Sequence, residues 1–279
     1  MKLVDAHQHL WRLSRGDYAW LTPELRALYR DFEPGDLAPL LAENNVAATV
    51  LVQAAATEEE THFLVELARK HSFIKGVVGW TDFAAPDAAQ RIAALAAASG
   101  GVLKGLRPMI QDIADPDWVQ RPELDAAFAA MIVHDLAFDA LVKPAHIPAL
   151  LARLARHPLL RTVIDHAAKP DIAHGGFDAW APSLERLARE TGAYCKLSGL
   201  LTEARSGATL DDLAPYVEHV LACFGPERVL WGSDWPVLDL ASDYPGWLGM
   251  ARRLAARCAP GFEAKVFGET AAQFYRLEL

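Results

Sequence analysis

Two short motifs near opposite ends of the chain carry residue types that could do chemistry. His7 and His9 are separated by one residue at the end of an apolar run, and Asp234 follows another apolar run far along the chain. In a β-strand, residues two apart point to the same side, so both imidazoles would face one way. If the first and last strands pair in a closed sheet, Asp234 lies beside them. Two imidazoles and a carboxylate can bind a metal ion or transfer protons.

Asp234 fits two chemical roles beside these histidines. With a divalent metal ion bound, zinc being the first candidate, His7, His9 and Asp234 would be its ligands, and Asp234 would also accept a proton from bound water. Without a metal, Asp234 would act as a general base. The sequence leaves metal-dependent and metal-independent catalysis open. The structural alternative is two core histidines and an aspartate that caps the turn before Pro236, but the His-x-His motif together with the late aspartate favours function.

Further polar residues follow other apolar runs. His166 could be a ligand or polarise a substrate carbonyl, and a core histidine is the structural alternative. Arg107 offers a planar fork that suits a carboxylate, and Lys143 offers a point charge. Surface ion pairs are the alternative for both, but two cations at one mouth of an acidic protein predict an anion or oxyanion site. The weaker candidates for substrate binding are Gln53, Lys196, Trp80 and Trp235.

The elements that must position these residues alternate along the chain. Eight short apolar runs predict β-strands, and the longer segments between them have helical spacing. Thr57 and Glu60, for example, form a capping box at the start of one helix. The predicted strands are Leu3–His9, Ala48–Gln53, Ile74–Trp80, Val102–Pro108, Phe138–Pro144, Thr162–His166, Ala193–Ser198 and Arg228–Ser233. The predicted helices are Pro34–Asn44, Glu58–Lys70, Asp87–Ala98, Glu123–Asp135, Ile147–Arg156, Asp178–Thr191, Leu210–Phe224, Tyr244–Cys258 and a last one at Glu269–Tyr275.

This alternation, with strands apolar on both faces, predicts an α/β fold: a parallel (β/α)8 TIM barrel, as a single domain over residues 1–279. Such a barrel needs roughly 250 residues, and its catalytic groups lie at the carboxyl ends of the strands, where the polar candidates fall. The runner-up is an open doubly wound sheet, which the lack of a G-x-G-x-x-G turn after the first strand disfavours. The aromatic segment Leu10–Phe32 predicts a long loop after strand one, either over the barrel mouth or packed on itself.

Composition excludes several classes of protein. The formal net charge of −9 argues against nucleic-acid or anionic-membrane partners, and 52% hydrophobic with 23% charged residues is typical of a soluble globular protein. Three separated cysteines, no signal-peptide pattern and no run of about 18 apolar residues predict a cytoplasmic protein without a membrane span. No G-x-S-x-G elbow or P-loop is present, and whether the chain forms a homo-oligomer stays open.

The ordered set of motifs resembles a known family. The His-x-His strand, the strand ending in His166 and the Gly232–Pro236 segment resemble the amidohydrolase superfamily, in its amidohydrolase-related branch. Four further stretches are similar to the sugar-lactone lactonase group of that branch, which includes L-fuconolactonase, L-rhamnonolactonase and 2-pyrone-4,6-dicarboxylate lactonase. These stretches are Lys104–Arg107 with Gln111 and Asp112, Val163–His166 with Lys169 and Pro170, Cys195–Leu200, and Phe224–Arg228.

The resemblance implies a (β/α)8 barrel that hydrolyses a cyclic ester, a lactonase acting in carbohydrate metabolism on a small-molecule lactone. It implies that Asp234 takes a proton from water and that the hydroxide attacks the lactone carbonyl. His7, His9 and His166, or a metal ion they hold, would stabilise the oxyanion. Arg107 and Lys143 would orient oxygens of the sugar acid.

Two departures from the family pattern bear on metal and substrate. Metal-dependent relatives usually carry a histidine at the end of strand five, where this chain has Lys143, and many lactonases of this type carry a histidine where this chain has Pro108. A protonated lysine cannot be a ligand. The alternative functions are a metal-dependent decarboxylase or an amide or C–N hydrolase of the same superfamily, and a non-catalytic binding protein.

Overall fold

A closed ring of eight parallel strands forms the centre of the molecule. The computed structural model describes residues 2–279, and in it each strand pairs with the next in chain order, from β1 to β8. The ring closes where Asp234 N donates to His7 O at 2.8 Å and His9 N donates to Trp235 O at 2.7 Å. The predicted barrel is therefore confirmed, and the open-sheet alternative is wrong. The strands are β1 (Leu3–Gln8), β2 (Val46–Val52), β3 (Ile74–Gly79), β4 (Leu103–Leu106), β5 (Ala137–Ala140), β6 (Thr162–Ile164), β7 (Tyr194–Leu197) and β8 (Val229–Trp231).

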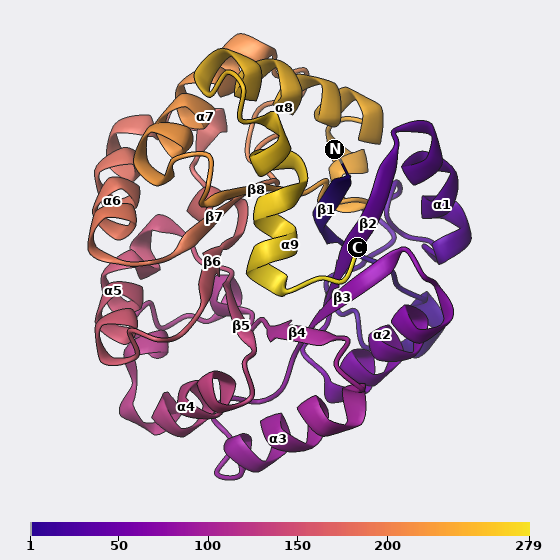
Figure 1. Cartoon of the computed structure of the whole chain (residues 1–279), viewed down its shortest axis with the longest axis vertical. Coiled ribbons are helices and arrows are strands. Elements are labelled where there is room, and N and C mark those ends of the chain that lie inside the picture. Colours follow the sequence, from indigo (N-terminus) through magenta and orange to yellow (C-terminus); the bar gives the residue numbers. More distant parts are fainter. Residues whose placement is uncertain (1) are drawn as a thin grey trace.

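Helices surround this ring, and one further helix lies across one end of it (Figure 1). Local signals start several of them; the Thr57 hydroxyl, for example, accepts a hydrogen bond from Glu60 N at the start of α2, as the capping box predicts. The helix across the barrel end, α9, contacts β1 and β8. The helices are α1 (Pro34–Glu43), α2 (Glu58–Lys70), α3 (Ala88–Ser99), α4 (Asp125–Val133), α5 (Ile147–Arg156), α6 (Phe177–Glu190), α7 (Leu210–Phe224), α8 (Tyr244–Cys258) and α9 (Thr270–Tyr275).

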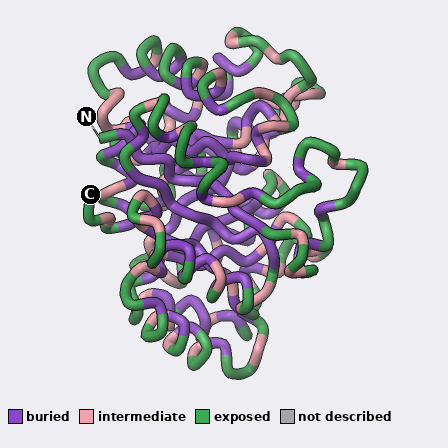
Figure 2. The backbone as a smooth tube through the Cα atoms, turned by 90° about the vertical axis from the view of Figure 1, so that its right-hand side faces the viewer, coloured by how far each residue is buried: buried purple, intermediate pink, exposed green. Residues whose placement is uncertain are grey.

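The strands are buried on both faces, whereas the helices expose their outer faces (Figure 2). A glycine brings the last strand close to the first. A Cβ atom added at Gly232 would lie 2.6 Å from the Cβ atom of His7, a distance that real side chains do not reach. The Trp247 indole N–H donates to Gly232 O at 2.9 Å and ties the same residue to α8. Glycine at this position therefore allows the contact that brings Asp234 to the histidines.

The segment Leu10–Phe32 is the long loop that the sequence predicts. Trp11 and Phe32 pair through their backbones, and their rings lie 5.1 Å apart, centre to centre. Trp20 packs edge-on against Trp11 at 5.5 Å. The loop thus packs its own aromatic residues, and through Trp20 it also reaches the cavity described below. Among the helices of residues 2–279, none has the length and apolar character that crossing a membrane requires.

Candidate active site

His7, His9 and Asp234 meet at the carboxyl-terminal rim of the barrel. The two Nε2 atoms of the histidines lie 3.2 Å apart. Asp234 Oδ1 lies 3.6 Å from His7 Nε2 and 3.3 Å from His9 Nε2. All three side chains are buried. The proximity that the sequence predicts from closure of the sheet is confirmed.

A cavity of about 300 Å³ opens above these residues, at the ends of the strands. His9, Arg107, His166 and Asp234 line it, so four predicted site residues share one cavity, while His7 lies beneath them. Sequence reasoning missed several other lining residues. Among them are Trp20, Met109, Gln111, Asp112, Lys169 and Thr202.

His166 reaches the cavity through an unusual left-handed turn. Four consecutive residues from His166 to Lys169 have φ between 50° and 59°, and none is glycine. This conformation costs about 1–2 kcal/mol for each L-residue. The surroundings stabilise it: the Trp180 indole N–H donates to Ala167 O at 2.7 Å, and His166 Nδ1 lies 2.8 Å from Ser198 Oγ. Gly199 leaves the necessary space, because a Cβ there would lie 2.5 Å from His166 Nδ1.

The protonation states of the two residues that face each other across the cavity follow from burial and charge. Burial lowers the pKa of His166 to about 4. Burial opposes ionisation of Asp234, but the nearby imidazoles of His166, His9 and His7 outweigh it and hold the pKa of this carboxyl well below its usual range. His166 Nε2 lies 3.9 Å from Asp234 Oδ1. At neutral pH, the cavity therefore presents an ionised carboxylate beside a neutral imidazole.

A buried cluster of charges supports the histidines from below. Lys196 Nζ lies 2.5 Å from Asp139 Oδ2, 3.0 Å from Asp165 Oδ1 and 3.0 Å from His7 Nδ1. Arg107 Nη1 lies 3.3 Å from the other oxygen of Asp165. Burial opposes ionisation of Asp165, but the Lys196 ammonium, His7 and Arg107 hold its pKa well below the usual range, whereas burial raises the pKa of Asp139 to about 6. Burial and the Lys196 charge lower the pKa of His7.

The spacing of the donor atoms suits three corners of a tetrahedral metal site, but their protonation does not. The ligand atoms of His7, His9 and Asp234 lie within 4.8 Å of one another. The Lys196 ammonium has three protons and no lone pair and lies 3.0 Å from His7 Nδ1, nearer than Arg107 Nη1 lies to His7 Nε2 at 3.4 Å. We therefore assign the lone pair of His7 to Nδ1 and its proton to Nε2. A protonated nitrogen is not a metal ligand. His9 Nδ1 donates to Val52 O at 2.8 Å, so His9 Nε2 carries a lone pair, which faces the His7 Nε2 proton at 3.2 Å. Two good donors remain, fewer than the three protein ligands of a catalytic zinc centre.

The structure places the other predicted residues outside the cavity lining. Gln53 is buried, and its Oε1 accepts from Arg107 Nε at 2.9 Å. Lys196 lies under His7, and Trp235 packs edge-on against Phe32 with ring centres 5.2 Å apart. Trp80 is half-buried, and its backbone exchanges hydrogen bonds with Thr61.

The predicted position of Lys143 is wrong. The sequence predicts a strand that runs to residue 144 and presents Lys143 to the substrate, but β5 ends at Ala140 and Lys143 is exposed. The chain has already turned before a short helical turn at Pro144–His146. The polar side chain that β5 directs into the barrel is Asp139. An aspartate inside an otherwise apolar strand was the signal that could have identified it.

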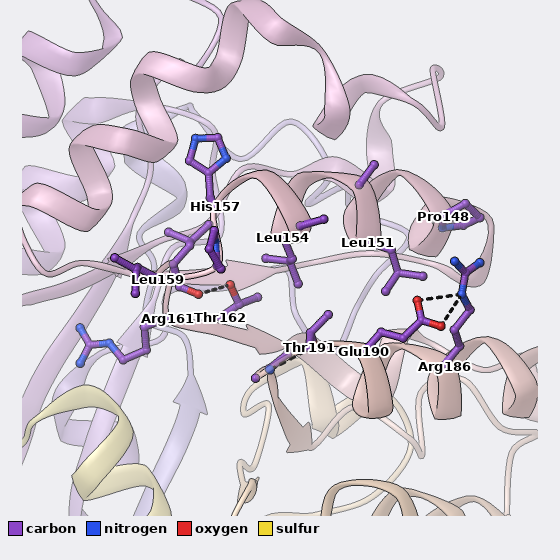
Figure 3. A pocket seen from close by; sticks show the side chains of 16 residues that line it. Pro148, Leu151, Leu154, His157, Leu159, Arg161, Thr162, Arg186, Glu190 and Thr191 are labelled. Atoms are coloured by element: carbon purple, nitrogen blue, oxygen red, sulfur yellow. Dashed lines mark hydrogen bonds and ion pairs between the residues drawn. The ribbon is translucent and has the colours of Figure 1, made fainter.

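A second cavity, of about 540 Å³, lies between α5 and α6 on the outside of the barrel (Figure 3). Its lining includes Leu151, Leu154 and Leu159, together with the Arg186–Glu190 ion pair at 3.1 Å. It contains none of the predicted site residues. The chemistry-bearing side chains therefore gather in the cavity at the strand ends.

Comparison with known proteins shows the family of this chain. The profile of the amidohydrolase family matches residues 4–277. L-fucono-1,5-lactonase from Burkholderia ambifaria is 48% identical, with 99% of this chain and 96% of the relative covered. L-fucono-1,5-lactonase from Burkholderia multivorans is 37% identical, with 98% and 96% covered.

A crystal structure of an amidohydrolase from Burkholderia multivorans with bound zinc is also similar. It superposes with a TM-score of 0.93 at 36% identity and covers 100% of both chains. The match of the family profile to almost the whole sequence, the two relatives of similar length and the shared barrel lead to one conclusion. The chain belongs to the amidohydrolase family.

Proposed function

We propose that this chain is a lactonase that opens a small sugar-acid lactone of the L-fucono-1,5-lactone type, with Asp234 as the general base. The observation that carries the proposal is the buried, ionised carboxylate of Asp234 in a cavity that also holds His9, Arg107 and His166. The names of the two relatives, which match over nearly the whole chain, support lactone hydrolysis and this substrate type.

In the proposed reaction, Asp234 removes a proton from a water molecule as the water oxygen bonds to the lactone carbonyl carbon. The carbonyl oxygen then becomes an oxyanion. We assign its stabilisation to the Arg107 guanidinium and to imidazole N–H groups. Among the imidazoles, His166 lines the cavity, and its Nε2 carries the proton when Ser198 donates to its Nδ1. His7 lies beneath the cavity, and its Nε2 proton faces His9 Nε2. Each such donor is typically worth about 3–4 kcal/mol of transition-state stabilisation.

Collapse of the tetrahedral intermediate breaks the bond between the carbonyl carbon and the ring oxygen. The proton held by Asp234 passes to this oxygen, which leaves as a hydroxyl group, and the product is an open-chain hydroxy acid. The acid loses its own proton to solvent, so each turnover releases one proton. Asp234 returns to its ionised form.

We propose that this reaction does not require a bound metal, because Lys196 occupies His7 Nδ1. If zinc binds as it does in the related crystal structure, His9 and Asp234 are the residues of this chain that would hold it, and it would supply a Lewis acid for the carbonyl oxygen. Dialysis against a chelator tests this point. Lactonase activity that survives dialysis supports the proposal, whereas activity lost and restored by zinc contradicts it.

A pH-indicator assay over a panel of aldonolactones, with L-fucono-1,5-lactone included, tests the function. Turnover of a sugar-acid lactone that disappears in Asp234→Asn supports the proposal. Folded protein with no turnover of any lactone would contradict it, and decarboxylation or C–N hydrolysis would then be assayed with divalent metals. Binding of a lactone with the same affinity in both proteins, without turnover, would indicate a binding protein.

We also propose that residues 1–279 form one domain of a cytoplasmic enzyme that acts on a small molecule rather than a nucleic acid. The three cysteines are free, and the acidic charge of −9 supports this assignment. Size-exclusion chromatography with light scattering measures whether the enzyme is a monomer or a homo-oligomer.

A further inference from the structure

Three consecutive backbone carbonyls at the end of β2 each accept a hydrogen bond from a cavity side chain. Val52 O accepts from His9 Nδ1 at 2.8 Å. Gln53 O accepts from Arg107 Nη2, and Ala54 O accepts from Trp20 Nε1 at 2.8 Å. These three side chains come from different parts of the chain, and all three line the cavity. The short segment 52–54 therefore fixes part of the site.

The N–H groups of the same segment point to one buried carboxylate. Ala54 N lies 3.0 Å from both carboxylate oxygens of Glu60, and Ala55 N lies 2.7 Å from Oε2. Glu60 is on α2 and is 0% exposed. Among residues 2–279, no basic side chain lies within ion-pair distance of it; its charged or titratable neighbours are Asp17 and Tyr18 of the loop after β1. A buried carboxylate without a cation partner is rare, so its N–H partners are the contacts to explain.

We propose that Glu60 is a positioning residue for the lactone site. It holds the segment 52–55 through two backbone N–H groups, and this segment in turn fixes His9, Arg107 and Trp20. Gln53 strengthens the link, because its side chain donates to Ala55 O at 2.9 Å and accepts from Arg107 Nε at 2.9 Å. The predicted effect of Glu60 on activity rests on the proposed function, whereas its predicted effect on the positions of His9, Arg107 and Trp20 does not.

The contacts predict what a substitution does. Glu60→Gln keeps the size of the side chain but turns one acceptor into an N–H₂ group, which faces a backbone N–H and cannot accept from it. A glutamine oxygen at the Oε2 position can still accept from Ala54 N and Ala55 N, but the amide NH₂ group then takes the Oε1 position, 3.0 Å from Ala54 N. We expect this contact between two donors to shift the segment and the three cavity side chains with it. Because a displacement of about 1 Å in a catalytic group can cost roughly a hundredfold in rate, we expect kcat/KM to fall between about tenfold and a hundredfold, mostly in kcat.

Glu59→Gln is the matched control, because Glu59 is the preceding residue of α2 and is exposed. Burial raises the pKa of Glu60 to about 7, so both variants are compared at pH 8 or above, where each substitution removes a charge. We expect its kcat/KM to stay within twofold of wild type. A double-mutant cycle with Trp20→Phe, which removes the indole N–H donor to Ala54 O, then separates positioning from general destabilisation. Positioning predicts that Glu60→Gln costs at least threefold less in the Trp20→Phe background. Equal costs in both backgrounds, or a Glu60→Gln enzyme within twofold of wild type, would overturn the proposal.

Crystal structures of wild type and Glu60→Gln keep the two proposals distinguishable. If wild type turns over no lactone, the proposed function fails, but displaced His9, Arg107 and Trp20 side chains in the variant still support a positioning role for Glu60. If the variant retains all three hydrogen bonds to the β2 carbonyls, the positioning role is refuted whatever the activity. Should Glu60→Gln not fold, Glu60→Asp replaces it in both experiments, because it keeps the charge and shortens the side chain by one methylene.

Discussion

Replacing Lys196 by methionine tests the buried charge cluster under the site. The substitution keeps a long side chain but removes the cation that contacts His7, Asp139 and Asp165 together. Breaking a buried ion pair from one side costs about 3–5 kcal/mol, because it leaves an uncompensated charge. With about 2–4 °C per kcal/mol for a large domain, the melting temperature should fall by roughly 6–20 °C.

The loss of stability in Lys196→Met should depend on pH, and the pKa of Asp139 determines the direction of this dependence. The pKa of this carboxyl is about 6 in the folded protein, above its ordinary value, so the folded state gains stability as pH falls through that range. Lys196 is the main opposing influence and lowers this pKa, so removing it raises the pKa further. For each pKa unit by which Asp139 rises in Lys196→Met, the loss in free energy of unfolding is about 1.4 kcal/mol smaller at pH 5 than at pH 8. Lys196→Met should therefore be less destabilising at pH 5.

Urea unfolding of both proteins at pH 5 and pH 8 measures these free energies. Lys70→Met is the control, because Lys70 is exposed and pairs only with Glu66 at 3.7 Å, so its free energy of unfolding should hardly change at either pH. A Lys196→Met protein that loses less than about 1 kcal/mol at pH 8, or the same amount at both pH values, would refute this account of the cluster.

Three further predictions concern activity. Asp234→Asn removes the proposed base without changing its size, so kcat should fall about 10²–10⁴-fold with a smaller change in KM; steady-state kinetics would contradict this if kcat fell less than tenfold. Arg107→Met removes a charged donor and should lower kcat about 10²–10³-fold, whereas Arg107→Lys, which keeps the charge, should lose less. Equal losses in the two variants would show that the charge alone contributes nothing, and no loss in either would contradict a role for Arg107 in stabilising the oxyanion. Because the pKa of His166 is about 4, kcat/KM should drop near pH 4, when an imidazolium forms beside Asp234, and this drop is separate from the titration of Glu60, whose pKa burial raises to about 7. A profile without any drop near pH 4 would exclude His166 as a group that must be neutral.

The sequence predicted the barrel and the meeting of His7, His9 and Asp234 because both depend on periodicity. Residues two apart share a face of a strand, and a closed parallel ring brings its first and last strands together. Such patterns can be read from the order of residue types alone. The same reasoning predicted the Thr57 cap, which the structure confirms. The reciprocal half of the predicted capping box is wrong, because the Glu60 carboxylate accepts from Ala54 N and Ala55 N instead.

Positions that depend on where a strand ends could not be predicted in this way. The prediction for Lys143 is wrong because β5 ends at Ala140, four residues before the predicted end at Pro144, and Asp139 is the residue that points inward. Lys169 reaches the cavity only because the backbone after β6 is left-handed, a conformation that no rule of residue type assigns to His-Ala-Ala-Lys. The contacts of Glu60 depend on where α2 packs against the barrel, which is a tertiary property.

The turn from His166 to Lys169 has a consequence for protein engineering. Glycine adopts positive φ at little cost, so a programme that selects for heat resistance would favour it at Ala167 or Ala168. The same replacement would free the backbone that aims His166 at the cavity. At these two positions, glycine is expected to raise thermal stability and to lower the turnover rate.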